Sequence, residues 1–205
     1  MFTNTLPAST AQLLEKLKGA EFLQDFYLSG GTALSLQLGH RESEDLDFFN
    51  QNSFQAEKIK LKLQELGELA GIEEGEDTLN AFVDKVKIQF LGYPYKLLEP
   101  LVDWQGIKLS SVLDIACTKL LTISARGSRK DFIDLYVLLD KFSLNELFLA
   151  VEEKYRGSDY NKIHILKSLS YFDDAQIEPM PRLHTEIVWQ ELKRTIIAEV
   201  KKYQF

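Results

Sequence analysis

Two short motifs in the first quarter of the chain carry residue types that could bind phosphate and metal. The first is the pair Gly30-Gly31, which follows the β-forming residues 26–28 and precedes the helix-forming segment 32–38. The sequence therefore predicts a glycine turn at the N-terminus of a short helix. Backbone N–H groups at such a position have no partner within the helix and can bind phosphate oxygens.

The second motif is Asp45-Leu46-Asp47, at the start of the apolar run that ends at Phe49. Side chains alternate along a strand, so both carboxylates point to one face and Leu46 to the other. Like charges this close repel each other unless a cation lies between them. Mg²⁺ is typically held by one or two carboxylates together with substrate phosphates. Taken alone, two acids on a strand more often mark a solvated sheet edge, but the glycine turn beside them favours a metal site formed by Asp45 and Asp47.

Together, the two motifs resemble the signature of a known superfamily. Ser29-Gly30-Gly31 followed by Asp45-Leu46-Asp47 is similar to the pattern of the polymerase-β-like nucleotidyltransferases. The fuller segment GGTALSLQLGHRESEDLDFF resembles the AbiEii/AbiGii-type nucleotidyltransferase toxins of bacterial abortive-infection and toxin–antitoxin systems. The resemblance implies a Mg²⁺-dependent enzyme that transfers a nucleoside monophosphate from an NTP to a hydroxyl. It also implies an RNA acceptor such as the 3′ end of tRNA, with a protein hydroxyl as second choice, and a cognate antitoxin as a partner.

The resemblance assigns phosphate contacts to residues around the glycine turn. Gly30, Gly31 and Thr32 would bind the outer phosphates of the NTP, and Arg41 and Ser43, just before the acids, would contact phosphate too.

A later segment, ACTKLLTISARGSRKDFIDLY, resembles the second conserved block of the same family. The residues that match the block are Lys119, Arg126, Arg129, Asp131 and Asp134. By this resemblance, Lys119 neutralises charge at the phosphates, and Asp131 orients or deprotonates the acceptor hydroxyl. The alternative is a helical hairpin whose charges only cap the helix ends.

The superfamily often carries a third carboxylate on the next strand, where this chain has Lys87 or Gln89. Lys85 and Lys87 either face nucleotide phosphate or merely solvate the sheet. The missing acid leaves open a different class of function, a catalytically silent module that binds a nucleotide or a partner protein. A third alternative is an antibiotic nucleotidyltransferase, for which the acidic run 73–77 could supply a pocket for cationic drugs.

The predicted fold is α+β: a small mixed β-sheet nucleotidyltransferase core flanked by helices, with an all-helical C-terminal half. We expect the core over residues 1–109 and the helical half over 110–205, with the active cleft between them. The expected helices cover residues 9–18, 32–38, 54–66, 110–125, 129–139, 160–172 and 184–203, and another begins at Ser143. Capping boxes are expected at residues 9–12 and 143–146, and Ser110 or Ser111 is expected to cap the helix at 110–125. The expected strands cover 26–28, 45–49, 79–83, 86–91 and 104–109, with a solvated loop at 73–77.

Composition limits the class of protein. The chain of 205 residues has a formal net charge of −7, which argues against indiscriminate nucleic-acid binding but leaves room for a local basic patch. No apolar run approaches the roughly 20 residues of a membrane-spanning helix, and the N-terminus lacks the features of a signal peptide. The single cysteine, Cys117, excludes a disulfide and fits a reducing compartment. We therefore expect a cytoplasmic protein without a membrane partner.

Overall fold

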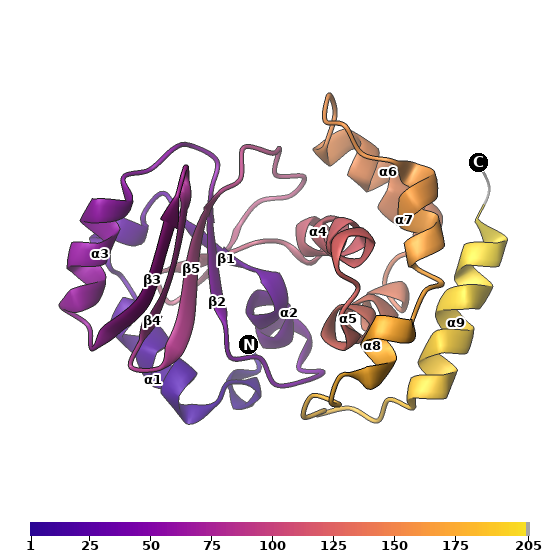
Figure 1. Ribbon diagram of the computed structural model, residues 1–205, viewed down its shortest axis with the longest axis horizontal. Helices are drawn as coiled ribbons and strands as arrows, with labels where there is room; N and C mark the ends of the chain where they lie inside the picture. Colours follow the sequence, from indigo (N-terminus) through magenta and orange to yellow (C-terminus); the bar gives the residue numbers. More distant parts are fainter. Residues whose placement is uncertain (204–205) are drawn as a thin grey trace.

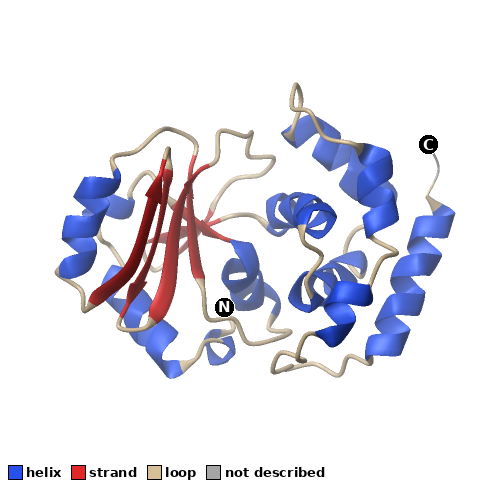
Figure 2. Cartoon of the chain, in the orientation of Figure 1, coloured by secondary structure: helices blue, strands red, loops and turns tan. Residues whose placement is uncertain are grey.

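A computed structural model describes residues 1–203, and it combines one mixed sheet with an all-helical second half (Figure 1). Figure 2 shows strands and helices in one part of the molecule and helices alone in the other, and the last strand ends at Leu109. The strands are β1 (Tyr27–Ser29), β2 (Leu46–Asn50), β3 (Leu69–Gly75), β4 (Thr78–Val83), β5 (Val86–Gly92), β6 (Val102–Trp104) and β7 (Ile107–Leu109). The α-helices are α1 (Ala8–Leu17), α2 (Gly30–Leu38), α3 (Ala56–Gln64), α4 (Val112–Ala125), α5 (Arg129–Leu139), α6 (Leu144–Lys154), α7 (Lys162–Ser168), α8 (Asp173–Ile177) and α9 (Trp189–Lys202). Short 3₁₀ turns cover Thr3–Thr5 and Glu21–Leu23.

The seven strands lie in the order β3-β4-β5-β2-β1-β7-β6. β1 pairs antiparallel with β2 and parallel with β7, and β2 pairs parallel with β5. The strand pairs at the two edges, β3–β4 and β6–β7, are antiparallel hairpins. The α+β class with a mixed sheet is therefore confirmed. β1, which leads into the glycine turn at Gly30, lies beside β2, which begins directly after Asp45.

Alternation along the strands separates an apolar face from one that carries the two acids together with the buried rings of Tyr27 and Phe49. Leu28, Phe48 and Phe90 are at most 1 % exposed and occupy one face, where the rings of Phe48 and Phe90 stack with centroids 5.4 Å apart. Helices α1 and α3 contact the strands on this side of the sheet. Such burial of large apolar side chains stabilises the sheet by about 1.5–3 kcal/mol for each. The two acids of β2 are therefore held to the opposite face.

Serine caps begin the helices of the second half. The Ser111 hydroxyl accepts a hydrogen bond from Asp114 N–H at the start of α4, and the Ser128 hydroxyl does so from Asp131 N–H at the start of α5. Ser143 and Glu146 form the expected capping box at α6. Helix α2 contacts α4 and α5, and one apolar core runs through both parts of the described chain. This contact brings the glycine turn next to the second sequence block.

Several element boundaries differ from the sequence prediction. Residues 69–75 form an edge strand instead of a loop, because β3 pairs with β4 through its backbone while its side chains stay exposed and show no alternation. The expected strand at 104–109 is a hairpin of two strands that turns at residues 105 and 106. Helix α1 begins after Pro7 without a side-chain cap, so the expected capping box at residues 9–12 is wrong. Helices α7 and α9 are shorter than predicted.

Candidate active site

The two acids of the first motif lie at the start of β2, on the face of the sheet opposite the apolar one. Asp45 immediately precedes the strand, and Asp47 is its second residue. Between them, Leu46 is fully buried in the core, so the backbone is fixed where the carboxylates emerge. In the sheet register Asp47 lies between Ser29 of β1 and Gln89 of β5. The structure therefore confirms the shared face of the two acids and leaves no carboxylate at the neighbouring β5 position.

The glycine turn lies against the second acid. Gly30 has a φ of +65°, a left-handed conformation that favours glycine, and a Cβ added there would lie 2.2 Å from Asp47 Oδ2. Gly30 is also the first residue of α2, and the side chain of the preceding Ser29 makes no cap hydrogen bond. The first N–H groups of this helix therefore remain without a side-chain cap next to a carboxylate. Phosphate and metal ligands would meet at this point.

Asp47 carries an electrostatic cost that the fold does not remove. Burial raises the pKa of its carboxyl, and the charge of Asp45 raises it further, against smaller opposing effects of Lys119, Lys87 and Arg126. Within residues 1–203, no hydrogen bond or ion pair joins either carboxylate to another side chain. The pair is therefore a place where a cation would be stabilising.

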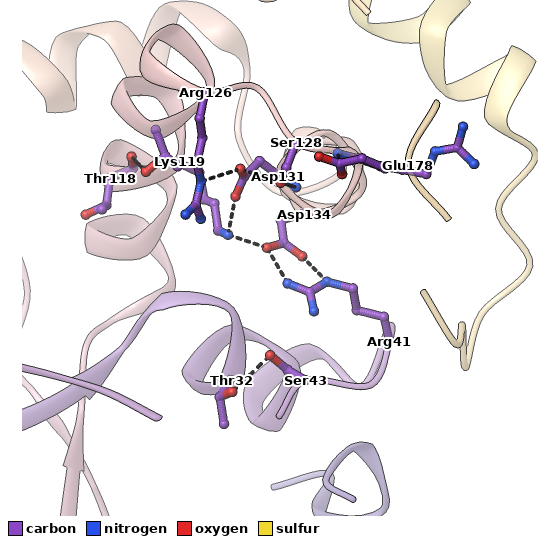
Figure 3. A network of polar contacts seen from close by, with 12 residues as sticks. Thr32, Arg41, Ser43, Thr118, Lys119, Arg126, Ser128, Asp131, Asp134 and Glu178 are labelled. Carbon is purple, nitrogen blue, oxygen red and sulfur yellow. Dashed lines mark hydrogen bonds and ion pairs between the residues drawn. The ribbon is translucent and has the colours of Figure 1, made fainter. Parts of the chain in front are cut away.

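Lys119 of α4 lies between the two aspartates of α5, as Figure 3 shows. Its Nζ is 2.9 Å from Asp131 Oδ1 and 2.6 Å from Asp134 Oδ2, and the residue is only 6 % exposed. Asp131 also accepts a hydrogen bond from the Ser128 hydroxyl at 2.7 Å and lies 3.3 Å from the Nε of the exposed Arg126. The second sequence block thus forms a buried ion cluster.

Arg41 completes this cluster from the loop after α2. Its Nε and NH2 donate to the two oxygens of Asp134 at 2.7 and 2.8 Å, and its NH1 donates to the Glu42 carbonyl. The neighbouring His40 donates through Nε2 to Asp134 Oδ1 at 2.7 Å. A Cβ at Gly31 would lie 2.5 Å from Arg41 NH2, so the second glycine makes room for this contact. The paired guanidinium therefore links the glycine turn to α5.

Charge pairing dominates the ionisation of the cluster. Burial alone would raise the pKa of Asp134, but Arg41 and Lys119 hold it well below its usual range. Burial also acts to raise the pKa of Asp131, and the charge and hydrogen bond of Lys119 lower it overall. For Lys119, burial acts to lower the pKa, but the charges of Asp134 and Asp131 outweigh it and raise it. All three groups are therefore charged at neutral pH.

This geometry contradicts two of the expected contacts. Arg41 is 2 % exposed and bonded through all three guanidinium nitrogens, so it is not available to an incoming phosphate. Asp131 is 1 % exposed and both of its oxygens are engaged, so it is not placed to deprotonate an acceptor hydroxyl. Both residues instead position others: Arg41 holds the loop before the acids, and Asp131 holds Lys119.

Thr32 and Ser43 connect the glycine turn to the loop that leads into the acids. The fully buried Thr32 hydroxyl donates to the Asp45 carbonyl, and its Oγ1 lies 2.9 Å from Ser43 Oγ. Ser43 Oγ would lie 3.2 Å from a Cβ on Gly31, so its hydroxyl borders the turn. Thr32 therefore fixes the backbone at the first acid, while the phosphate contact expected of Ser43 stays a prediction.

Cavities near the acids occupy the side of the sheet away from Lys119. A cavity of about 270 Å³ is lined by Asp45 together with Ser9, Thr10, Glu44, Phe82, Lys85, Val86 and Lys87. A larger one, about 720 Å³, lies along α3 and contains neither acid. The chemistry of the carboxylate pair, rather than cavity size, marks the site. The cavity beside Asp45 is lined only by residues of the first half of the chain, whereas we expected a cleft between the halves.

Comparison with known families agrees with this arrangement. The family model described as nucleotidyl transferase AbiEii toxin of type IV toxin–antitoxin systems matches residues 12–205. The chain belongs to the AbiEii family. The match spans both sequence blocks, so the family that the motifs resemble is confirmed, and with it the broad class of nucleotidyltransferase toxin.

Individual relatives support the AbiEii fold. An uncharacterised protein of Aquifex aeolicus (strain VF5) is 38 % identical over 198 residues, which cover 94 % of each chain. Among solved structures, a candidate nucleotidyltransferase from Helicobacter pylori matches with a TM-score of 0.61 at 14 % identity, covering 95 % of this chain and 92 % of that one. JHP933 from the same organism matches with a TM-score of 0.57 at 15 % identity, covering 95 % and 90 %. At these identities the two structures show a shared fold.

Sequence reasoning missed the polar partners that surround the AbiEii motifs. His40 was expected only to end a helix, yet it bonds Asp134. Asn80 lies level with Asp47 two strands away, which only the strand register reveals. Cys117 is buried and burial raises the pKa of its thiol to about 12, which fits the expected packing role. Among residues 1–203, no helix has the length and apolarity that crossing a membrane requires.

Proposed function

We propose that this AbiEii protein transfers a nucleoside monophosphate from an NTP to a hydroxyl at the end of an RNA, with Mg²⁺ held by Asp45 and Asp47. The observation that carries the proposal is the acid pair itself. Two unpaired carboxylates on one strand face border an uncapped helix N-terminus, and the pKa of Asp47 is raised by burial and by its neighbour's charge. A cation with phosphate ligands would offset both the burial of the Asp47 charge and its repulsion by Asp45.

The donor set fits Mg²⁺. Asp45 and Asp47 supply carboxylate oxygens, and Mg²⁺ in nucleotide enzymes uses one or two carboxylates and completes its coordination with phosphates and water. The described residues contain no group of three or more His, Cys, Asp or Glu side chains placed to hold a metal, so phosphate oxygens would have to complete the shell. When bound, the ion would neutralise charge on the triphosphate and on the leaving pyrophosphate.

The chain's own groups supply the remaining parts of this chemistry. The N–H groups at Gly30 and Gly31 can donate to phosphate oxygens, and the N-terminal end of the helix dipole favours negative charge there. Lys119 is close enough to Asp47 for its charge to lower the pKa of that carboxyl, so it also contributes positive potential to the phosphates. Because Asp131 and Asp134 fix its ammonium group, no reorganisation is needed during the reaction.

The acceptor and the partner are the finer parts of the proposal. Membership of the AbiEii family supports a cognate antitoxin as partner, because the family is described as part of a toxin–antitoxin system. An RNA 3′ end, such as that of tRNA, is the first-choice acceptor, and a protein hydroxyl is the second. Both present a hydroxyl nucleophile, so the same site serves either.

Labelled nucleotides test the proposal. The protein is incubated with each α-labelled NTP and Mg²⁺, with total RNA in one reaction and total protein in another. We expect label in RNA, no label when EDTA is present, and none with Asp47→Asn. Label that enters RNA equally well with Asp47→Asn, or in EDTA, would contradict the metal assignment.

One observation favours a second candidate, a silent module that binds nucleotide without turnover. Gln89 stands level with Asp47 on β5, where the superfamily often has a third carboxylate, and the engaged Asp131 offers no replacement base. This candidate predicts that MgNTP raises the melting temperature while no acceptor becomes labelled. Labelled product from any acceptor would eliminate it.

A further inference from the structure

The uncovered face of β4 and β5 continues the face on which the two acids lie. In the sheet register Asp47 pairs with Gln89, and Gln89 pairs with Asn80 of β4. Two residues earlier on β5, Lys87 pairs with Phe82, and Asp45 likewise precedes Asp47 by two. These residues therefore form two neighbouring rows that run across β2, β5 and β4. One row begins with Asp45 and the other with Asp47, the two acids of the candidate metal site.

Burial shows that this face is open while the other face of the same strands is packed. Leu79, Ala81 and Ile88 are at most 1 % exposed on the core face, whereas Phe82 on the opposite face is 41 % exposed. Lys87 is also exposed, and Gln89 is half-buried. The edge of the Phe82 ring lies against Gly71 of β3, and the rest of the ring is left in solvent next to a lysine, two strands away from the acids. The core does not explain this placement, because the apolar side of β4 is already filled.

The cavity beside Asp45 joins this face to the site. It is lined by Phe82, Lys85 and Lys87 as well as by Asp45, and its volume of about 270 Å³ is below the about 300–1,000 Å³ of pockets that enclose whole ligands. Such a space suits the end of a longer molecule. Lys85 reaches this cavity from a tight hairpin turn in which both Asp84 and Lys85 have positive φ, at +48° and +70°.

We propose that the face formed by Asn80, Phe82, Lys85, Lys87 and Gln89, here called the acceptor platform, holds the single-stranded 3′ end of the RNA acceptor. The proposal rests on the proposed function and names the surface that presents the acceptor. The phosphate-binding groups, the glycine turn and Lys119, lie on the β1 and helical side of the acids. The acceptor platform lies on the other side, so an acceptor there would meet the phosphates at Asp45 and Asp47.

The chemistry of the acceptor platform matches single-stranded nucleic acid. An exposed ring stacks on an unpaired base, and the two lysines attract the phosphates on either side of that base. The half-buried amide of Gln89 can donate to and accept from hydroxyl and base-edge groups. The short row of lysines also agrees with the formal net charge of −7.

The first test measures binding of a 12-nucleotide single-stranded RNA by fluorescence anisotropy, without NTP, so that it does not depend on turnover. Phe82→Ala should weaken binding about tenfold, since one stacked base contributes that much. Phe82→Tyr should restore it. The matched control is Phe2→Ala, which removes an aromatic residue with 51 % exposure that does not line this cavity. Equal affinity of Phe82→Ala and Phe2→Ala would overturn the proposal.

Salt dependence tests the lysines. Two phosphate contacts predict a slope of about −1.4 in log K against log salt for single strands, and Lys87→Ala should make it shallower by about 0.7. Lys108→Ala is the control, because Lys108 is an exposed lysine on β7 at the other end of the sheet. An unchanged slope with Lys87→Ala would contradict the phosphate contact.

Kinetics separate this inference from the proposed function. In transfer assays Phe82→Ala should raise KM for the RNA acceptor about tenfold and leave KM for the NTP and the MgNTP-induced rise in melting temperature unchanged. If Asp47→Asn leaves transfer intact, the proposed metal site fails while the binding data still decide on the acceptor platform. If wild-type protein labels proteins and not RNA, the chemistry stands and the acceptor platform is rejected.

Discussion

The molecule contains two pairs of aspartates that the fold treats in opposite ways. On β2, no ion pair within residues 1–203 holds Asp45 or Asp47, and burial and the charge of Asp45 raise the pKa of Asp47. On α5, Asp131 and Asp134 are almost fully buried, and cations lower the pKa of both carboxyls. The two pairs are linked by Lys119, which bonds the second pair and acts electrostatically on the first.

The two pairs differ in whether the chain itself balances their charge. Buried charges persist when each is paired and hydrogen-bonded, as around Asp134, where His40, Arg41 and Lys119 converge. An unpaired acid pair has no such structural value, and the fold places it beside a turn whose left-handed backbone favours glycine. We infer that the β2 pair binds a cation from outside the chain, while the α5 pair keeps Lys119 charged and in place.

The largest expected effect is on catalysis, in the β2 pair. Asp45→Asn or Asp47→Asn should lower transfer by about 1,000-fold, because the metal supplies several kcal/mol of transition-state stabilisation. The melting temperature should stay the same or rise, since the substitution relieves repulsion. Initial rates with labelled NTP and calorimetry measure both effects. Asp103→Asn, an exposed strand aspartate on β6, is the matched control; a similar loss of activity in it would break the contrast.

The buried pair should respond through stability. Asp134→Asn leaves Arg41 and Lys119 without their shared anion, so the free energy of unfolding should fall by about 3–5 kcal/mol. Urea titration measures this loss, with Asp140→Asn at the exposed end of α5 as control. A change below about 0.5 kcal/mol would show that the cluster is not structural.

Lys119 sharpens the comparison because it belongs to both regions. Lys119→Arg keeps a positive charge between the α5 aspartates but moves and spreads it, so turnover should fall about tenfold with KM for NTP little changed. Lys154→Arg is the matched control, since Lys154 is equally buried and pairs with Asp114 at 2.6 Å, away from the site. Equal turnover in the two variants would assign Lys119 to structure alone.

The smallest expected effect is on how the stability of the protein changes as the pH becomes acidic. Because the pKa of Asp134 in the folded protein lies well below its ordinary value near 4, its ion pairs stabilise the protein fully above that ordinary value. That contribution is lost as pH falls through the lower pKa of the folded state. The contribution of these ion pairs to the free energy of unfolding of the wild type should therefore be constant between pH 5 and 7 and should fall below about pH 4. The decline should be shallower in Asp134→Asn; an identical slope would contradict the pairing.

Local sequence signals predicted the parts of the site that lie close together along the chain. Apolar alternation in residues 45–49 placed Asp45 and Asp47 on one face, and Ser111 and Ser143 marked helix starts correctly. Contacts between distant segments were not readable. Arg41 looked like a phosphate ligand because its partner, Asp134, is 93 positions away.

Side-chain exposure explains the remaining differences between the sequence predictions and the structure. The edge strand β3 lacks an apolar face and so resembled an acidic loop. Asp131 carried the expected residue type for a base, but its burial depends on how α4 packs on α5. Whether a charged residue is paired or free is decided by tertiary contacts, and sequence patterns report these only indirectly.

Binding of Mn²⁺ tests the central claim most directly, because this ion takes the same oxygen ligands as Mg²⁺ and is visible by electron paramagnetic resonance. The protein is titrated with Mn²⁺ in the presence of a non-hydrolysable NTP, alongside Asp47→Asn and Asp134→Asn. We predict nucleotide-dependent binding in the wild type, its loss in Asp47→Asn, and its retention in the folded fraction of Asp134→Asn. Undiminished Mn²⁺ binding by Asp47→Asn would contradict the account.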